Sequence, residues 1–301
     1  MGSKYLGYRL AQRLSVALPS PVAFRWAQRL ADVCWRCSAP DCAAVQANLS
    51  MALGMPLERR SPLVREVFRN FSRYVVEFFT MHQRERPDIT VEGHDHLAEA
   101  RRGRLGAILL TAHLGNWEFG AALIRRMGFP VSAVALPHPD PRMDRLFNRQ
   151  RQRCGVTVIP LGHHAGRRSL QSLRSGALLG LLGDRDFTGN GVRVSLCGRQ
   201  VALPRGPAIL SLKSGAPLLP TFLLREGPWR FRLCVEPPIW PAIREEEDQQ
   251  IRALTQAHAT VLERYLKRAP DQWLLFQPLA ADPSRGEGEG EGAACVADTA
   301  S

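Results

Sequence analysis

The segment around His113 combines an imidazole and a carboxylate five residues apart. A short apolar run, 107–112, leads into His113, and Gly115 and Asn116 then form a turn before a helix with Glu118 in its first turn. Sites in α/β sheets lie at the carboxyl ends of strands. A glutamate that bonds one ring nitrogen fixes the tautomer, and the other nitrogen can then take a proton from a substrate hydroxyl. The pattern predicts a general-base dyad of His113 and Glu118.

A structural interpretation of the same residues stays open beside the catalytic one. Asn116 is a suitable N-cap, and a glutamate in the first turn is stabilised by the helix dipole. The spacing alone does not decide between these uses of Glu118.

Signatures of other catalytic machinery are absent from the sequence. It contains no G-x-S-x-G, H-E-x-x-H or G-x-x-x-x-G-K-[ST] pattern and no dinucleotide fingerprint. Covalent serine catalysis and P-loop chemistry are therefore disfavoured. The remaining chemistry is attack by a hydroxyl of the substrate, assisted by a base, while basic groups hold an anionic co-substrate.

Short apolar runs alternate with helical patterns from residue 105 onward, and these elements must position the site. The runs predict strands at 107–112, 131–136, 156–160, 177–182, 192–196, 218–224 and 229–235. Helices are predicted at 116–127, 142–154, 165–175, 206–214 and 245–268. The first four are followed directly by glycine, a common C-cap. Alternation of strands and helices is typical of an α/β fold.

The formal net charge of +12 comes almost wholly from arginine. The 301 residues include 40 Lys+Arg, of which 37 are arginine, against 28 Asp+Glu. Guanidinium groups favour bidentate recognition of phosphate or carboxylate, so anionic partners are expected. The composition, 45% hydrophobic and 23% charged, excludes global disorder, collagen and coiled coil. A basic module that binds nucleic acid is an alternative, although the arginines are spread along the chain and no nucleic-acid motif is present.

The first 40 residues predict two short amphipathic helices, separated at Pro19 and Pro21. Their apolar positions recur at helical spacing and are Leu6, Leu10 and Leu14 in the first helix and Trp26, Leu30, Val33, Cys34 and Cys37 in the second. Two interpretations remain open: helices that lie on anionic lipid, or a hairpin packed on the core with a solvated basic face. Because no run reaches about 18 apolar residues and no signal peptide is recognisable, we expect a cytoplasmic or peripheral protein.

Two further patterns are interpreted as structural. A helix that begins at Ser61 and Pro62 carries an aromatic stripe, which is expected to be core packing, with an acyl-chain groove as the alternative. Cys34 and Cys37 match C-x-x-C but lack both a strand-to-helix turn and a second pair, so reduced thiols are expected.

Several blocks of sequence accompany the segment 113–118, which reads HLGNWE. They are 149–155 (RQRQRCG), 181–192 (LLGDRDFTGNGV), 204–207 (PRGP), 214–220 (SGAPLLP) and 270–273 (PDQW). Together they resemble the bacterial branch of the lysophospholipid acyltransferase superfamily that holds the lipid A late acyltransferases and the phosphatidylinositol mannoside acyltransferases. The resemblance runs from about residue 5 to about residue 280. It implies a mixed sheet flanked by helices, as in glycerolipid acyltransferases, preceded by N-terminal amphipathic helices.

The resemblance also implies a reaction and its residues. A fatty acyl group would pass from an acyl thioester, acyl-CoA or acyl-ACP (acyl-carrier protein), to a hydroxyl of a membrane glycolipid, without a metal or another cofactor. His113 would be the general base and Glu118 its orienting partner. The residues expected to bind substrate are Asn116, Arg149, Arg151, Asp184, Asp186 and Arg205. Arg151, with Arg149 beside it, would hold phosphate or stabilise the oxyanion, and one of the two aspartates would position an arginine or a substrate hydroxyl; an ion pair with Arg185 or Arg193 is the structural alternative.

Departures from the family pattern bear on location and acceptor. The chain offers basic amphipathic segments where lipid A enzymes usually begin with a hydrophobic anchor, so we expect peripheral attachment to the cytoplasmic face of the membrane. Residues 274–278 lack the histidine and arginines common in the lipid A group, which favours a phosphatidylinositol-mannoside-like acceptor and leaves a lipid A precursor open. A lipid or thioester hydrolase with the same dyad is a further alternative. We expect a membrane-associating segment at 1–45, the α/β acyltransferase domain at 46–283 and a disordered tail at 284–301.

Overall fold

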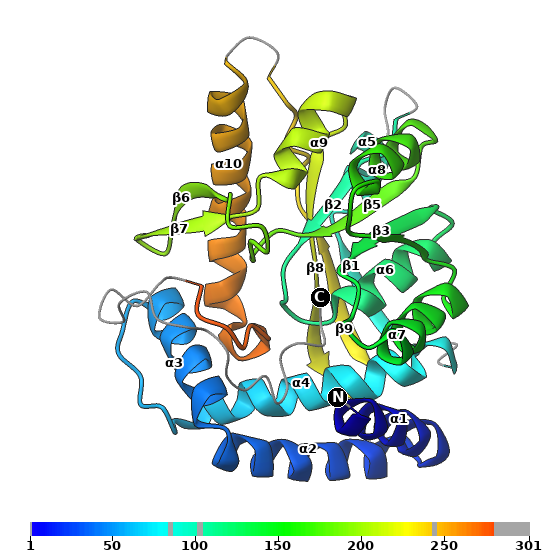
Figure 1. Cartoon of the computed structure of the whole chain (residues 1–301), viewed down its shortest axis with the longest axis vertical. Coiled ribbons are helices and arrows are strands. Elements are labelled where there is room, and N and C mark those ends of the chain that lie inside the picture. The colour runs from blue at the N-terminus through cyan, green and yellow to red at the C-terminus, as the bar shows by residue number, and fades with distance from the viewer. Residues whose placement is uncertain (1, 84–86, 101–104, 243–245, 280–301) are drawn as a thin grey trace.

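The computed structural model describes residues 2–83, 87–100, 105–242 and 246–279, and within them a mixed sheet has helices on both faces (Figure 1). The α/β fold with a mixed sheet and N-terminal helices is thereby confirmed. The helices are α1 (Gly2–Ala17), α2 (Ser20–Cys37), α3 (Ala39–Leu53), α4 (Pro62–Thr80), α5 (His94–Ala100), α6 (Trp117–Arg126), α7 (Pro141–Arg153), α8 (Ala165–Arg174), α9 (Gly206–Ser214) and α10 (Glu247–Arg268), with short 3-10 turns η1 (Met81–Gln83) and η2 (Pro270–Gln272). The strands are β1 (Asp88–Glu92), β2 (Ile108–Thr111), β3 (Val131–Ala135), β4 (Thr157–Pro160), β5 (Leu178–Leu182), β6 (Val192–Leu196), β7 (Arg199–Leu203), β8 (Leu218–Gly227) and β9 (Arg230–Val235).

The seven-stranded sheet has the order β1-β9-β8-β2-β5-β3-β4, which places β2 in the middle. β2 pairs in parallel with β5 on one side and with β8 on the other. The pair β8–β9 is antiparallel, and β6 and β7 form a separate hairpin. Because parallel neighbours end at the same edge, the residues that follow β2 and β5 are brought together there.

The alternation of side chains along β2 explains how the sheet is covered. Leu109 packs with Phe119 of α6 and Phe147 of α7 on one face, whereas Ile108 and Leu110 contact the layer formed by α8, α9 and α10 on the other. A strand buried on both faces reads as a continuous apolar run, which is why the sequence predicted it.

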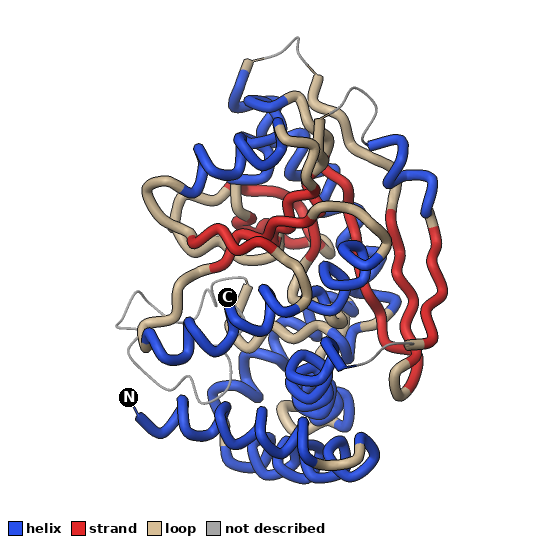
Figure 2. Tube along the Cα trace, turned by 90° about the vertical axis from the view of Figure 1, so that its right-hand side faces the viewer, coloured by secondary structure: helices blue, strands red, loops and turns tan. Residues whose placement is uncertain are grey.

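The N-terminal helices form the outermost layer at one end of the molecule, and α4 separates them from the sheet (Figure 1). In the view of Figure 2 this end consists of helices joined by loops. α2 packs through small residues, Ala23 and Ala31, and leaves Trp26 and Leu30 about 60% exposed. Leu6 on α1 is similarly exposed. Most of each apolar stripe therefore faces outward, whereas Cys34, at the end of the second stripe, packs against the core. No helix in the described ranges is long and apolar enough to span a bilayer.

Several elements were not predicted, and each lacks the pattern that the predictions used. β1 is an edge strand with mostly exposed side chains, and β7 is half polar, so neither forms an apolar run. The helices α3 and α5 were also missed. α3 runs across the predicted boundary at residues 45/46, and the predicted tail at 284–301 lies outside the described residues.

Candidate active site

The centre of the site is a buried pair formed by His113 and Asp184. His113 follows β2 by two residues, and Asp184 follows the neighbouring strand β5 by two residues. The His113 Nδ1 lies 2.9 Å from the Asp184 Oδ1, and the second oxygen, Oδ2, accepts from the backbone N–H of His113 and from the Trp273 indole, both at 3.0 Å. His113 is 3% exposed and Asp184 is fully buried. The sheet topology thus produces a histidine–carboxylate dyad.

The hydrogen bonds define the charge and the tautomer of this pair. Burial alone would raise the pKa of the Asp184 carboxyl, but the neighbouring imidazole and the bonds from His113 and Trp273 hold that pKa below its ordinary value. A carboxylate at Nδ1 keeps the proton on Nδ1 and leaves the lone pair on Nε2. Nε2 is not among the fully buried unpaired polar atoms of the described chain. The arrangement therefore presents an oriented base at Nε2.

Glu118 does not hold the place that the sequence predicted for it. Its carboxylate accepts from Arg151 on α7, at 2.9 and 3.1 Å from Nε and 2.6 Å from Nη2, and both side chains are buried. The prediction that Glu118 orients His113 is wrong, because α6 carries the glutamate towards α7 while β5 supplies the carboxylate at Nδ1. Arg151 also donates from Nη1 to Asn148 at 2.9 Å, so each of its nitrogens already has a protein partner.

Removal of either member of the Glu118–Arg151 pair is expected to destabilise the fold. In Glu118→Ala the buried guanidinium loses its carboxylate, and we expect the free energy of unfolding to fall by about 3–5 kcal/mol. The double variant E118M/R151M, which leaves no unpaired charge, should recover most of that loss. Urea unfolding measures both. If Glu118→Ala unfolds at the urea concentration of the wild type, the pair has no such structural role.

The turn between His113 and α6 is held from two directions. Gly115 has φ +68°, and a Cβ there would lie 2.0 Å from the carbonyl oxygen of Leu223 on β8, so glycine is required. The backbone N–H of Asn116 donates to that same oxygen at 2.9 Å. From the other side, Gly115 N–H donates to the carbonyl of Gln272 in η2. The block 270–273 thus packs directly on the turn that follows His113, a contact that no local pattern revealed.

Asn116 caps α6 as its sequence position indicated. Its Oδ1 accepts from the Phe119 N–H at 3.0 Å, and its Nδ2 donates to the Glu77 carboxylate at 2.8 Å. Both halves of the amide are thus used by the protein, and the side chain is fully buried. Substrate binding by Asn116 stays a prediction.

The other predicted binding residues lie on different elements. Asp186 closes its own loop, since its oxygens accept from the N–H groups of Thr188 and Gly191. Arg149 is exposed on α7, and Arg205, at the start of α9, donates to Asp248 at 3.1 Å. Of the two aspartates, Asp184 is therefore the one that the structure joins to His113.

A second histidine lies behind this pair, and no sequence pattern indicated it. His258, on α10, is buried against Gly183, where a Cβ would lie 2.7 Å from its Nε2. Burial lowers the pKa of His258 to about 4, so the ring is neutral at physiological pH. Only a glycine at position 183 allows α10 to pack this closely behind Asp184.

Comparisons with known proteins agree with the resemblance found in the sequence blocks. The sequence model of a family described as bacterial lipid A biosynthesis acyltransferase matches residues 4–280. The chain is 31% identical over 248 residues to the phosphatidylinositol mannoside acyltransferase of Mycobacterium tuberculosis (strain CDC 1551 / Oshkosh), covering 78% of this chain and 75% of that protein. It is 29% identical over 285 residues to the phosphatidylinositol mannoside acyltransferase of Mycolicibacterium smegmatis (strain ATCC 700084 / mc(2)155), covering 91% and 90%.

Proposed function

Because the chain belongs to the bacterial lipid A biosynthesis acyltransferase family, we propose that it moves a fatty acyl chain from an acyl thioester to a hydroxyl of a membrane glycolipid, with His113 as the general base. The observation that carries the proposal is the 2.9 Å contact between His113 Nδ1 and Asp184, which leaves Nε2 as a proton acceptor.

The chemistry follows from this geometry. The acceptor hydroxyl donates a hydrogen bond to Nε2, and its oxygen attacks the carbonyl carbon of the thioester as the proton passes to the ring. An oxygen–carbon bond forms, the carbon–sulfur bond breaks, and the departing thiolate takes the proton from the imidazolium. Asp184, held ionised, stabilises the imidazolium between these two transfers. The cycle returns a neutral histidine.

A test of the proposal compares products with and without acceptor. Purified protein is mixed with a labelled acyl-CoA or acyl-ACP and vesicles that contain either a phosphatidylinositol mannoside or a lipid A precursor. We expect label in the glycolipid, and the names of the relatives favour the phosphatidylinositol mannoside. Label in free fatty acid alone, equal with and without glycolipid, would instead establish the hydrolase alternative.

We also assign the outward faces of α1 and α2 to an anionic membrane surface. Trp26 and Leu30 are exposed on α2 beside Arg25 and Arg29, and Arg29 lies over the Trp26 ring at 5.2 Å. Large apolar side chains interleaved with arginine are what an interfacial helix presents to anionic lipid. Peripheral attachment through this face would bring the enzyme to its lipid acceptor.

Trp26→Glu is expected to weaken binding to vesicles of phosphatidylcholine and phosphatidylinositol by about tenfold or more. Loss of one buried indole exceeds the roughly 1.4 kcal/mol that corresponds to a factor of ten. Co-sedimentation measures the bound fraction, which should also fall with added salt. Trp240→Glu is the matched control, because Trp240 is an exposed tryptophan between β9 and α10. Equal binding by the two variants would contradict the assignment.

A further inference from the structure

A buried glutamate on α4 contacts the turn that carries the catalytic histidine. We propose that Glu77 is a positioning residue for acyl transfer: through the Asn116 amide it fixes the turn, and hence the direction of His113 Nε2. The proposal rests on the function proposed for His113. It assigns to the Glu77–Arg225 ion pair a role in catalysis besides its role in packing.

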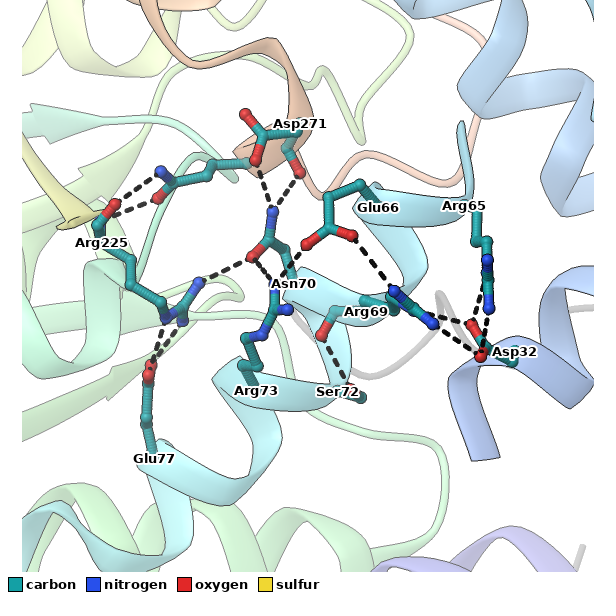
Figure 3. Close-up of polar contacts among 11 residues, drawn as sticks. Asp32, Arg65, Glu66, Arg69, Asn70, Ser72, Arg73, Glu77, Arg225 and Asp271 are labelled. Carbon is teal, nitrogen blue, oxygen red and sulfur yellow. Dashed lines mark hydrogen bonds and ion pairs between the residues drawn. The ribbon is translucent and has the colours of Figure 1, made fainter. Parts of the chain in front are cut away.

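Both carboxylate oxygens of Glu77 accept hydrogen bonds from the protein. The residue is fully buried, and its Oε2 accepts from Asn116 Nδ2 at 2.8 Å. Arg225 of β8 donates from Nε to Oε1 at 2.8 Å and from Nη2 to Oε2 at 2.5 Å. Figure 3 shows this bidentate pair, with the Arg225 guanidinium also reaching Asn70. The carboxylate is thus neutralised by one partner and has an oxygen directed at the catalytic turn.

Arg225, the second partner of Glu77, joins the buried carboxylate to β8 and to η2. Arg225 emerges from β8 two residues after Leu223, whose carbonyl holds the Asn116 N–H. The backbone of Arg225 exchanges two hydrogen bonds with the Gln272 side chain, at 2.8 and 2.9 Å, and the Gln272 carbonyl accepts from the Gly115 N–H. Strand, 3-10 turn and catalytic turn therefore meet at Arg225. Glu77 adds the fourth element, α4, to the same junction.

Asn116 links Glu77 to the turn because the oxygen and the nitrogen of its side-chain amide bind different elements. Its oxygen caps α6, and its nitrogen is held by Glu77 on α4. With the acceptor removed, the amide nitrogen is left buried without a partner, and the turn can move to reach another one. A displacement of about 1 Å at a reacting group can lower a rate by about 10²-fold. The effect should appear in kcat, since both amide atoms of Asn116 are already bound within the protein, to Glu77 and to the Phe119 N–H.

Two double variants separate the anchor from the ion pair. Both E77M/R225M and E77Q/R225M remove the pair without leaving an unpaired charge, and the side chains introduced at position 77 have similar length. Only the glutamine of E77Q/R225M retains an oxygen that can accept from Asn116 Nδ2. We expect kcat of E77M/R225M to be about 10²-fold below that of E77Q/R225M, with the KM for acyl-CoA equal in both. Thermal unfolding should show E77M/R225M only slightly less stable than E77Q/R225M, since the lost ion pair is common to both and the unpaired Asn116 amide nitrogen is the single added defect.

Amide hydrogen exchange gives a readout that needs no activity. The N–H groups of Gly115 and Asn116 should exchange faster in E77M/R225M than in E77Q/R225M, so the inference is tested even if the wild type transfers no acyl group. Glu66→Gln is the control within the same network. Glu66 also lies on α4, but it pairs with Arg73 and not with Asn116 (Figure 3). It should leave kcat and exchange unchanged.

The outcomes divide cleanly. Equal kcat and equal exchange in E77M/R225M and E77Q/R225M overturn the proposal, whether both are active or both impaired. If E77M/R225M does not fold, Asn116→Ser replaces it, because serine still caps α6 but has no amide to reach Glu77. Wild-type kcat in Asn116→Ser would then overturn the proposal, and a drop in kcat at unchanged KM would support it.

Discussion

His113→Ala should lower kcat for acyl transfer by about 10²–10⁴-fold, the range expected when a positioned general base is lost. Without the ring, no group takes the proton of the acceptor hydroxyl at the place where Nε2 stands. The KM for the acyl thioester should change little, since the imidazole acts on the hydroxyl. Initial rates with labelled acyl-CoA and glycolipid vesicles give both constants.

The control for this variant must preserve the environment of Asp184. In His113→Ala the buried carboxylate loses its bond from Nδ1, which by itself can destabilise the fold. His113→Asn retains an amide N–H near the position of Nδ1 and offers no base. Both variants should be equally slow, with the asparagine variant closer to the wild type in thermal stability. Rapid transfer by a folded His113→Asn would exclude general-base catalysis by this residue.

Local sequence predicted where the site lies but not which carboxylate completes it. The apolar run 107–112 and the turn at Gly115 located His113 at the carboxyl end of a buried strand. Glu118 was the only acidic neighbour that spacing could supply, because periodicity describes residues on one element. Asp184 lies 71 residues further along and reaches His113 only because β5 inserts between β2 and β3 in the sheet. That strand order depends on long-range packing, which no local pattern encodes.

Local periodicity also could not predict which way the apolar stripes of the N-terminal helices face. Periodicity identified the stripe at Trp26 and Leu30, but an apolar stripe can face the core or an external partner. Packing decides this: Ala23 and Ala31 allow close approach of α2 to α4, and Asp32 on α2 is bound by both Arg65 and Arg69. The face that carries Ala23, Ala31 and Asp32 therefore docks, and Trp26 and Leu30 remain outside. Figure 3 shows the contact of Asp32 with Arg65 and Arg69 of α4.

Asp184→Asn tests the dyad with almost no change of shape. Oδ2 accepts from two donors, the His113 N–H and the Trp273 indole, so the oxygen of an asparagine must take that place. Its amide nitrogen then faces Nδ1 and donates to it. The imidazole is forced into the tautomer with the proton on Nε2, which cannot accept a proton from the substrate.

We therefore expect kcat of Asp184→Asn to fall by about 10²–10⁴-fold with little change in KM, as the orienting carboxylate of a histidine base is lost. Nitrogen NMR of the His113 ring should show the proton moved from Nδ1 to Nε2. Asp186→Asn is the comparison, because the Asp186 oxygens accept from the N–H groups of Thr188 and Gly191 instead of contacting His113, and its kcat should change by less than about tenfold. If Asp186→Asn were the slower variant, the roles assigned to the two aspartates would be reversed. Sequence left that choice open. The contacts of Asp184 with His113 favour Asp184, and replacement of one carboxylate oxygen by an amide nitrogen is enough to test it.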